Sequence, residues 1–367
     1  MSGVAEHDQL RATLREFVAD HSPSSAVRRW MDAERGHDPV LWRRFAGELG
    51  LTGIAVPESY GGAGGGPVEL GIVLEELGRA LVPSPFFATV AMAGQALVAS
   101  GDEEARSRWL PGIADGSLTA TLAVTEETGS WQLDDLATVA TRHGLVWTVS
   151  GTKMFVVDGH TADLLLVVAN TAEQPALFAV EPTAAGVTRT RLDTLDPTRR
   201  LGRVDLDGAP AVRIRPSGPE FLRTVLDLVL IALAAEQVGG AQACLDAAVA
   251  YAKLRVQFDR PIGSFQAVKH KCADLLLRVE SARSAARHAA AVTAGGSDET
   301  SVVAAVAAGY CAAAFTHAAK ENIQLHGGIG YTWEHDAHLY LRRAKSSELL
   351  HGAPPTHRAR LADLLAI

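Results

Sequence analysis

The hydrophobic pattern of this chain changes its period twice, from helical to strand-like and back to helical. In the first third, apolar side chains recur at helical spacing, as Leu41, Phe45 and Leu49 do. The middle consists of short runs that favour strands, and the helical period returns from Pro219. Since no single type of element fits both periods, the pattern predicts a multi-domain α+β fold. The predicted domains are an N-terminal helical domain at 1–117, a β domain at 118–217 and a C-terminal helical domain at 218–367.

The middle of the chain has the spacing of a small all-β domain. Turn signals such as His143-Gly144 and Asp158-Gly159 separate the strand-like runs. Short strands at regular spacing predict an antiparallel sandwich or barrel. The predicted strands are 119–125, 137–142, 145–149, 154–157, 164–169, 176–180 and 187–191.

The C-terminal part reads as a bundle of long helices. Val268, Cys272, Leu275 and Val279 step by three and four, which predicts a seam that faces other helices. Gly295-Gly296 breaks the pattern before the next helix begins. Long helices joined by short links predict a four-helix bundle.

Composition excludes several classes of partner. The chain of 367 residues is 47% apolar, carries a net charge of −8 and has three cysteines without a Cys-x-x-Cys pair. The negative charge argues against nucleic acid and anionic membranes, and the cysteines predict no zinc site, no disulfide frame and a reducing cytoplasm. No histidine spacing predicts any other metal site. The longest apolar runs, 228–235 and 302–315, are expected to be too short to span a bilayer and to form buried helices.

The stretch 251–262 is the first candidate binding site. Lys253, Arg255 and Arg260 surround a predicted helix end, and Pro261 forces the chain to turn. An arginine beside exposed backbone amides suits a pyrophosphate. The alternative is a solvated helix end that binds nothing.

The stretch 324–331 is the second candidate. Gly327, Gly328 and Gly330 allow the backbone to approach a ligand and to present its amides, as phosphate-binding nests do. The alternative is that these glycines only end a helix. The cationic stretch around Arg255 at the start of the same bundle favours the binding site.

Together with earlier stretches, these two candidates resemble the acyl-CoA dehydrogenase family over nearly the whole chain. No single motif is decisive, but all of them occur in the order of the family. The motifs are Gly53-Ile54-x-x-Pro57-Glu58-x-Tyr60-Gly61-Gly62, Leu74-Glu75-Glu76-Leu77-Gly78, Thr125-Glu126, Gly151-x-Lys153 with Gly159 and Ala162-Asp163, Arg255-x-Gln257-Phe258, Phe265-Gln266 and Gln324-x-x-Gly327-Gly328.

The resemblance implies FAD as the cofactor, an acyl-CoA thioester as the substrate and α,β-desaturation with hydride transfer to the flavin. It also implies a tetramer in which each flavin lies between two subunits. One subunit holds the flavin ring and supplies the catalytic base, while its neighbour binds the diphosphate and adenosine. By resemblance, the residues of this second role are Arg255, Gln257, Phe258, Gln324, Gly327 and Gly328.

The flavin-ring side departs from the family pattern. Where the family has Thr-Glu-Pro-x-Ala-Gly-Ser-Asp, this chain has Thr125-Glu126-Glu127-Thr128-Gly129-Ser130-Trp131, shorter by about one residue. On the next flavin strand Phe155 keeps the aromatic ring, but Val157 replaces a hydroxyl. Valine cannot donate the hydrogen bond that steadies a reduced flavin. Thr125, Ser130 and Phe155 remain as candidates for contacts with a flavin of the same subunit.

The catalytic position departs as well. Just before Gly352 the family carries a glutamate, and here the residue is His351. Some members place the glutamate on an earlier helix, near Val229-Leu230 here, and Asp227 faces another side of that helix. Imidazole is able to act as a base, and Glu348 could serve only if the last helix shifted by about one turn. The alternative is that His351 is a surface histidine near the carbonyl dipoles of a helix end.

These departures resemble the base-less subunit of actinobacterial heteromeric (α2β2) steroid-CoA side-chain dehydrogenases. The first hypothesis is therefore a FAD-sharing subunit whose homologous partner carries the glutamate. One alternative is a self-sufficient homo-oligomeric flavoenzyme that uses His351 or Glu348. Another is a non-enzymatic scaffold with the same fold, because fold alone does not fix function.

Overall fold

The computed structural model describes residues 2–367 and confirms the order of helical, β and helical parts. The chain forms two compact units. The first contains the chain up to Arg29, Gly71–Val82 and Leu230–Ile367, and the second contains Trp30–Leu70 and Pro83–Val229. The N-terminal helices are thus shared between the two units, and the domain boundaries at 117 and 217 stay predictions.

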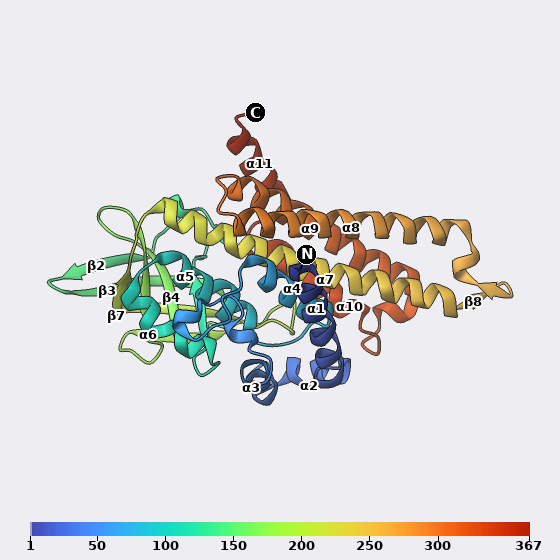
Figure 1. Cartoon of the computed structure of the whole chain (residues 1–367), viewed down its shortest axis with the longest axis horizontal. Coiled ribbons are helices and arrows are strands. Elements are labelled where there is room, and N and C mark those ends of the chain that lie inside the picture. The colour runs from blue at the N-terminus through green and yellow to red at the C-terminus, as the bar shows by residue number, and fades with distance from the viewer. Residues whose placement is uncertain (1) are drawn as a thin grey trace. The chain divides into compact units, whose positions relative to one another are not determined.

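Long helices make up the first unit (Figure 1). Leu275 and Val279 of its α8 are buried beside Phe315 and Ala344, which confirms the predicted seam. The helices are α1 (Ser2–His21), α2 (Ser24–Asp32), α4 (Pro67–Arg79), α7 (Pro219–Leu254), α8 (Gln266–Ala294), α9 (Thr300–His326), α10 (Ala337–Leu350) and α11 (Pro354–Leu365), of which α2, α4 and α7 continue into the second unit.

Helix α9 is longer than its apolar run predicts. Its hydrophobic stretch continues beyond residue 315, so that Thr300–Tyr331 is long and apolar enough to cross a membrane by length and composition alone. The expectation that this run is too short is therefore wrong. However, 67% of the apolar stretch is buried inside the protein. The expectation that it forms a buried core helix is confirmed.

Helices α4 and α7 approach each other through glycines. A Cβ on Gly239 would lie 1.8 Å from the carbonyl oxygen of Glu75, and one on Gly78 would lie 2.2 Å from that of Glu236. A Cβ on Gly240 would meet the Phe315 ring at 2.4 Å, so the next position of α7 is equally tight against α9. Because real Cβ atoms do not approach so closely, only glycine permits this crossing.

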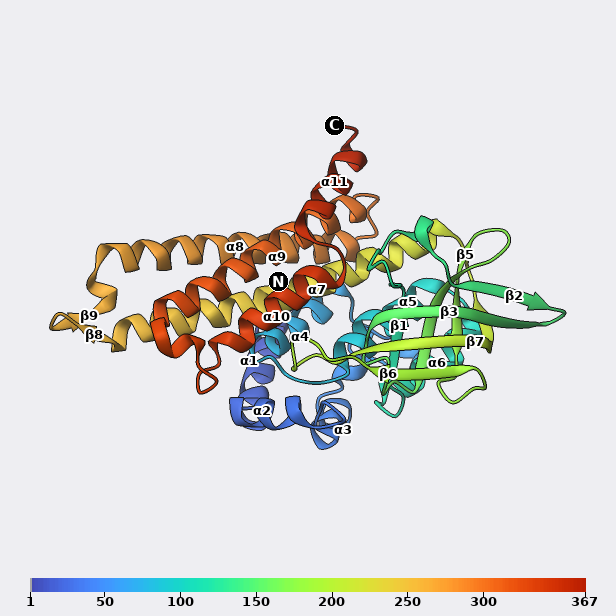
Figure 2. The ribbon, with the colours of Figure 1, turned by 180° about the vertical axis from the view of Figure 1, so that it is seen from behind.

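The second unit contains a seven-stranded sheet (Figure 2). Strands pair in the order β1-β4-β2-β3-β7-β5, and β5 also pairs with β4, which closes the sheet into a barrel. Most pairs are antiparallel as predicted, but β4 runs parallel to both β1 and β2. The strands are β1 (Ala120–Ala123), β2 (Val139–His143), β3 (Val146–Val157), β4 (Leu164–Asn170), β5 (Pro175–Val180), β6 (Val187–Arg191) and β7 (Leu201–Ile214).

Two strands differ from the prediction. The runs 145–149 and 154–157 belong to the single strand β3, because Gly151 takes a φ of +147° at an irregularity and lets the strand continue. The strand β7 was not predicted, although it pairs with β3, β5 and β6. Asp205 and Asp207 make the alternation of apolar and polar residues in this strand hard to recognise, and Gly208-Ala209-Pro210 is typical of a turn.

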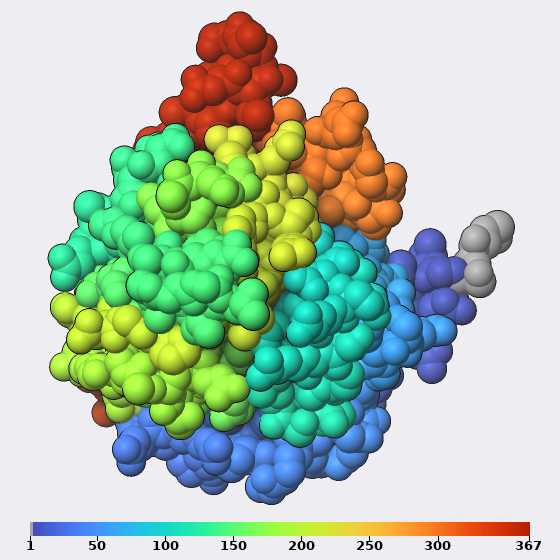
Figure 3. All heavy atoms as spheres, turned by 90° about the vertical axis from the view of Figure 1, so that its left-hand side faces the viewer, coloured from blue at the N-terminus to red at the C-terminus, as the bar shows by residue number. Residues whose placement is uncertain are grey.

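The second unit also holds helices that lie against the barrel. Thr89 and Ala120 hydrogen bond through the Thr89 hydroxyl at 3.1 and 3.2 Å, and the Asp102 carboxylate accepts from the Arg215 amide at 2.9 Å. In Figure 3 the helical segment around α6 and the neighbouring strands form one continuous face of this unit. The helices are α3 (Pro39–Gly47), α5 (Gln95–Ser100) and α6 (Glu103–Ala114), with the π-helical segment Phe87–Gly94 before α5.

Replacing Gly239 by alanine should lower the free energy of unfolding by about 3 kcal/mol, because the new methyl group forces α4 away from α7. Gly71→Ala on α4 is the matched control, since its Cβ would lie 3.7 Å from the Cβ of Ala235, an ordinary contact. Alanine there also favours the helix by about 1 kcal/mol over glycine. Denaturant unfolding followed by circular dichroism measures both, and equal stability of the two variants would contradict the tight crossing.

Candidate functional site

A strained hairpin follows the end of α7. Strands β8 (Val256–Gln257) and β9 (Arg260–Pro261) pair across a two-residue turn. Phe258 and Asp259 in this turn both adopt left-handed backbone angles, with φ of 54° and 58°. Such angles suit the turn of a tight hairpin but cost a non-glycine residue about 1 kcal/mol or more. The hairpin therefore holds its shape at a cost, with the Phe258 side chain 86% exposed.

Arg255 stands at the base of this hairpin with an exposed and uncommitted charge. Its backbone is fixed, since its amide donates to Tyr251 at 2.9 Å and its carbonyl accepts from Ile262 at 2.8 Å. Among residues 2–367, nothing forms an ion pair or a side-chain hydrogen bond with its guanidinium. By contrast, Arg260 lies 4.0 Å above the Phe265 ring, and the Gln257 amide donates to Val256 at 2.8 Å. The free fork of Arg255 suits a phosphate oxygen pair.

The second predicted candidate is an open turn after α9. Gly327 takes a φ of 64° and a ψ of −141°, a conformation that favours glycine. A Cβ on Gly327 or Gly328 would meet no atom within 4 Å, whereas one on Gly330 would lie 2.9 Å from the Ile323 carbonyl oxygen. The first two glycines therefore face open space, where a ligand can approach the backbone, and Gly330 fastens the turn to α9. Gln324 is exposed beside them.

An aromatic stack joins the two candidates. The ring of buried His326 lies 4.3 Å from the Tyr251 ring on one side and 4.3 Å from the His335 ring on the other. The Nδ1 atom of His326 is 2.8 Å from the carbonyl oxygen of Asn322. Burial, followed by the charge of His326, lowers the pKa of His335. Since Tyr251 lies one turn before Arg255 and His326 directly precedes Gly327, the stack places both candidates at one end of the bundle.

The predicted flavin-ring contacts lie on the barrel of the second unit. The Thr125 carbonyl accepts from the Met154 amide at 2.8 Å, which joins the end of β1 to β3. The Ser130 hydroxyl donates to Asp135 at 3.3 Å, so it is engaged within its own loop. Phe155 has a φ of 55° at an irregularity of β3 and is 42% exposed. The backbone of this surface takes an unusual conformation at Phe155, but the Val157 side chain offers no hydrogen-bond donor.

A buried ion pair supports this end of the barrel and was not predicted as a pair. Lys153 is fully buried and donates to Glu126 at 2.7 Å and to the Val124 carbonyl at 2.9 Å. Glu126 also accepts from the amides of Ala137 and Thr138 at 2.6 and 2.9 Å. Burial lowers the pKa of Lys153 to about 8 although Glu126 favours its charge. Burial raises the pKa of Glu126, but the hydrogen bonds from Lys153 and Thr138 outweigh it and leave that pKa below its usual value.

The position at which the resemblance places the catalytic base holds a buried histidine. His351 is 4% exposed, so the alternative of a surface histidine is wrong. Glu348 accepts from the Thr316 hydroxyl at 3.0 Å and pairs with Lys345, which ties it to α9 and to its own helix. Asp227 is 1% exposed on α7. No cluster of three metal-ligating side chains occurs among the residues that the structure describes.

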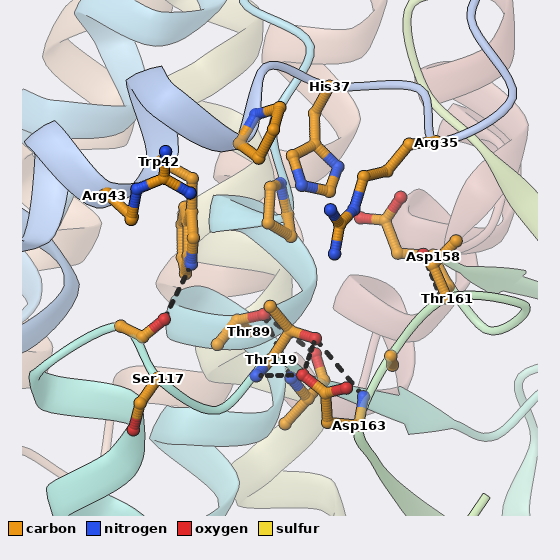
Figure 4. Close-up of a pocket in the computed structure, with 15 residues that line it drawn as sticks. Arg35, His37, Trp42, Arg43, Thr89, Ser117, Thr119, Asp158, Thr161 and Asp163 are labelled. Atoms are coloured by element: carbon orange, nitrogen blue, oxygen red, sulfur yellow. Dashed lines mark hydrogen bonds between the residues drawn. The ribbon is translucent and has the colours of Figure 1, made fainter.

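A polar cavity of about 160 Å³ lies in the second unit, apart from the predicted residues (Figure 4). Thr119 donates to Asp163 through its amide at 3.0 Å and its hydroxyl at 2.7 Å, and the Trp42 indole donates to the Gly116 carbonyl at 2.9 Å. Burial and the charge of Arg35 lower the pKa of His37 at its rim to about 4. Several polar groups that line the cavity therefore form hydrogen bonds with other residues of the cavity wall.

Replacing Lys153 by methionine should lower the free energy of unfolding by about 3 to 5 kcal/mol, because Glu126 would keep a buried charge without its cation. The double variant Lys153→Met/Glu126→Gln should lose less than Lys153→Met alone. Denaturant unfolding measures both. A double variant that is less stable than the single one would contradict this interpretation.

The pair also predicts a pH dependence. Because the pKa of Lys153 falls from 10.5 to about 8 on folding, the unfolded chain binds this proton more tightly. The wild type should therefore gain stability from this group between pH 8 and 10.5, and the Lys153→Met variant should lack that gain. The lowered pKa of Glu126 contributes stability above its usual pKa, which is lost as the pH falls through the folded value.

Comparison with known proteins covers the whole length of the chain. Three family models match it: acyl-CoA dehydrogenase, N-terminal domain, at residues 4–117; middle domain, at 121–207; and C-terminal domain, at 217–365. The chain is 38% identical to acyl-CoA dehydrogenase IpdE2 of Mycobacterium tuberculosis, with 96% of this chain and 95% of the relative covered.

Solved structures of the same class are similar in fold and sequence. A variant of the Tcur3481-Tcur3483 steroid ACAD has a TM-score of 0.91 and 34% identity, with 99% of this chain and 98% of that chain covered. The ChsE4-ChsE5 complex from Mycobacterium tuberculosis has a TM-score of 0.91 and 30% identity, with 98% of this chain and 97% of that chain covered.

Proposed function

The chain belongs to the acyl-CoA dehydrogenase family, and from this premise we propose that it is the base-less subunit of a FAD-dependent heteromeric enzyme. In this proposal it supplies the diphosphate half of a flavin site to a homologous partner in an α2β2 tetramer. The partner holds the flavin ring and carries the catalytic glutamate. The proposal also places the protein in the cytoplasm.

One contrast carries the proposal. The residues proposed to bind the diphosphate are exposed and accessible, whereas the residues that the family uses for catalysis are replaced in this chain. Arg255 has an exposed, uncommitted guanidinium, and Gly327 and Gly328 face open space. In the barrel Val157 offers no hydrogen-bond donor, and His351 stands where the family has its base. A chain that had lost both roles would have no reason to keep a strained hairpin beside a free arginine.

The residues present fit the cofactor. Arg255 would bind the phosphate oxygens, and the backbone at Gly327 and Gly328 would approach them closely, as in anion-binding nests. FAD supplies the hydride acceptor in this chemistry. In this proposal the chain binds and orients the cofactor of its partner and moves no proton itself.

The proposed substrate is an acyl-CoA thioester with a bulky steroid side chain. The similarity to the Tcur3481-Tcur3483 steroid ACAD supports this class. A tetramer that gives up half of its catalytic sites also leaves more room for each bulky substrate.

Co-purification with the product of a neighbouring acyl-CoA dehydrogenase gene tests the division of roles. The chain alone should hold little flavin and show no turnover, whereas the mixed complex should contain FAD and oxidise a steroid-CoA. In that complex His351→Gln should keep turnover within about twofold, since an imidazole outside the chemistry contributes nothing to the barrier. Full FAD and turnover from the chain alone, abolished by His351→Gln, would instead establish a self-sufficient enzyme.

Replacing Arg255 by alanine should strip FAD from the mixed complex while each subunit remains folded, because the charge-assisted bonds to the diphosphate are lost. Flavin absorbance at fixed protein concentration and circular dichroism measure the two effects. Lys253→Ala is the matched control, since it removes an exposed cation from the end of the same helix. Retained flavin in Arg255→Ala would show that the diphosphate binds elsewhere.

A further inference from the structure

The segment that follows the glycine turn is clamped by α2, about 300 residues away in the sequence. Arg28 donates through Nη1 to the Trp333 carbonyl at 2.6 Å and through Nε to the Asp336 carboxylate at 2.8 Å. Its Nη2 atom lies 2.6 Å from the same carboxylate. The Ser24 hydroxyl donates to Asp336 as well. One arginine thus bridges the end of the turn and the start of α10.

The clamp completes a fixation that begins on the other side of the turn. Gly330 packs against the Ile323 carbonyl of α9 so closely that a Cβ at this position would lie only 2.9 Å from the carbonyl oxygen. On the far side, the Trp333 ring lies 4.7 Å from the Arg342 guanidinium and 4.5 Å from the His338 ring. Gly327 and Gly328 lie between the end of α9 at His326 and this clamped segment, and they carry no side chain of their own. The position of their amides therefore depends on what holds the ends of the turn.

The geometry favours positioning over general stabilisation. The side chains of Arg28 and Asp336 are 27% and 36% exposed, so solvent screens their attraction. A guanidinium fork that contacts a carboxylate and a carbonyl at once fixes direction as well as distance. Removing it should loosen the turn without removing much of the stability of the unit.

We infer that Arg28, held by Asp336, is a positioning residue for the glycine turn that binds the FAD diphosphate. The inference rests on the proposed function, because it assumes that Gly327 and Gly328 contact the cofactor. A backbone nest that is not held in place loses part of its binding energy to the ordering of the chain. Helix α2 would thereby support a cofactor that it does not touch.

The test uses the mixed complex of this chain and its catalytic partner, stripped of flavin and titrated with FAD. Arg28→Ala should raise the FAD dissociation constant about tenfold, while turnover at saturating FAD stays within about twofold. Asp336→Asn should raise it similarly, and the double variant should cost no more than either single one, because both break one clamp. Arg28→Lys keeps the charge but not the fork and should be intermediate.

Two controls separate positioning from structure and from charge. Arg29→Ala removes the same charge from the next position of α2 and should leave FAD affinity unchanged. Thermal unfolding of the flavin-free complex should be nearly the same in all variants, whereas a merely structural role would lower it in Arg28→Ala. A FAD affinity of Arg28→Ala within twofold of wild type, in a complex that Arg255→Ala strips of flavin, would overturn the positioning role alone. If Arg255→Ala also keeps its flavin, the proposed function falls and this inference falls with it.

Discussion

The backbone contact between α4 and α7 is the constraint on which the first unit depends. At Gly78 and Gly239 the two helices meet without side chains between them. This close approach leaves the Glu75 carboxylate nearly buried at the crossing, where it pairs with Arg11 of α1 and Arg283 of α8. A buried carboxylate needs such partners, so the crossing draws two further helices to itself. The hairpin at Arg255 connects α7 with α8, and both of these helices contact the crossing.

The hairpin after α7 and the barrel each contain a feature that costs free energy, but for different reasons. Phe258 and Asp259 keep left-handed backbone angles in an exposed hairpin, with little burial to offset them. In the barrel, Lys153 and Glu126 form a buried, hydrogen-bonded ion pair. The proposed contact with the cofactor accounts for the cost of the hairpin, and the folding of the barrel alone accounts for the buried pair. Under the proposed function, the chain keeps the backbone features that bind the cofactor and leaves the proton transfer to its partner.

Much of the fold was predictable because hydrophobic period reports burial directly. The helical, β and helical order and the seam around Leu275 follow from spacing alone. Strand β7 escaped prediction because its pairing with three other strands comes from the barrel as a whole and not from its own alternation. Residues 145–157 were divided because Gly151 reads as a turn locally, whereas the sheet uses it as an irregularity within one strand.

The residues of the candidate site were likewise only partly predictable from the sequence. Arg255 and Gly327 were found because charge and glycine have a local meaning that survives in any context. The burial of His351 was not found, since it depends on how the end of α10 packs. The link between Arg28 and Asp336 was equally invisible, because two exposed-looking charges far apart in sequence carry no sign of their contact. Local signals indicate candidate binding groups, and only the fold reveals which other groups hold them.

The exposed end of the bundle also bears on the proposed pairing of this chain with a second subunit. Phe258 and Tyr331 are 86% and 74% exposed, and Val256 and Ile329 are 52% and 45% exposed, all on the hairpin and the glycine turn. Single exposed apolar side chains are ordinary, but several around one uncommitted arginine form a surface that water solvates poorly. Under the proposed function, a cofactor diphosphate would neutralise the arginine, and an apolar surface of the partner would cover the exposed side chains. Under the proposed function, a homologous subunit that has kept the hydrogen-bond donor and the base supplies the complementary surface.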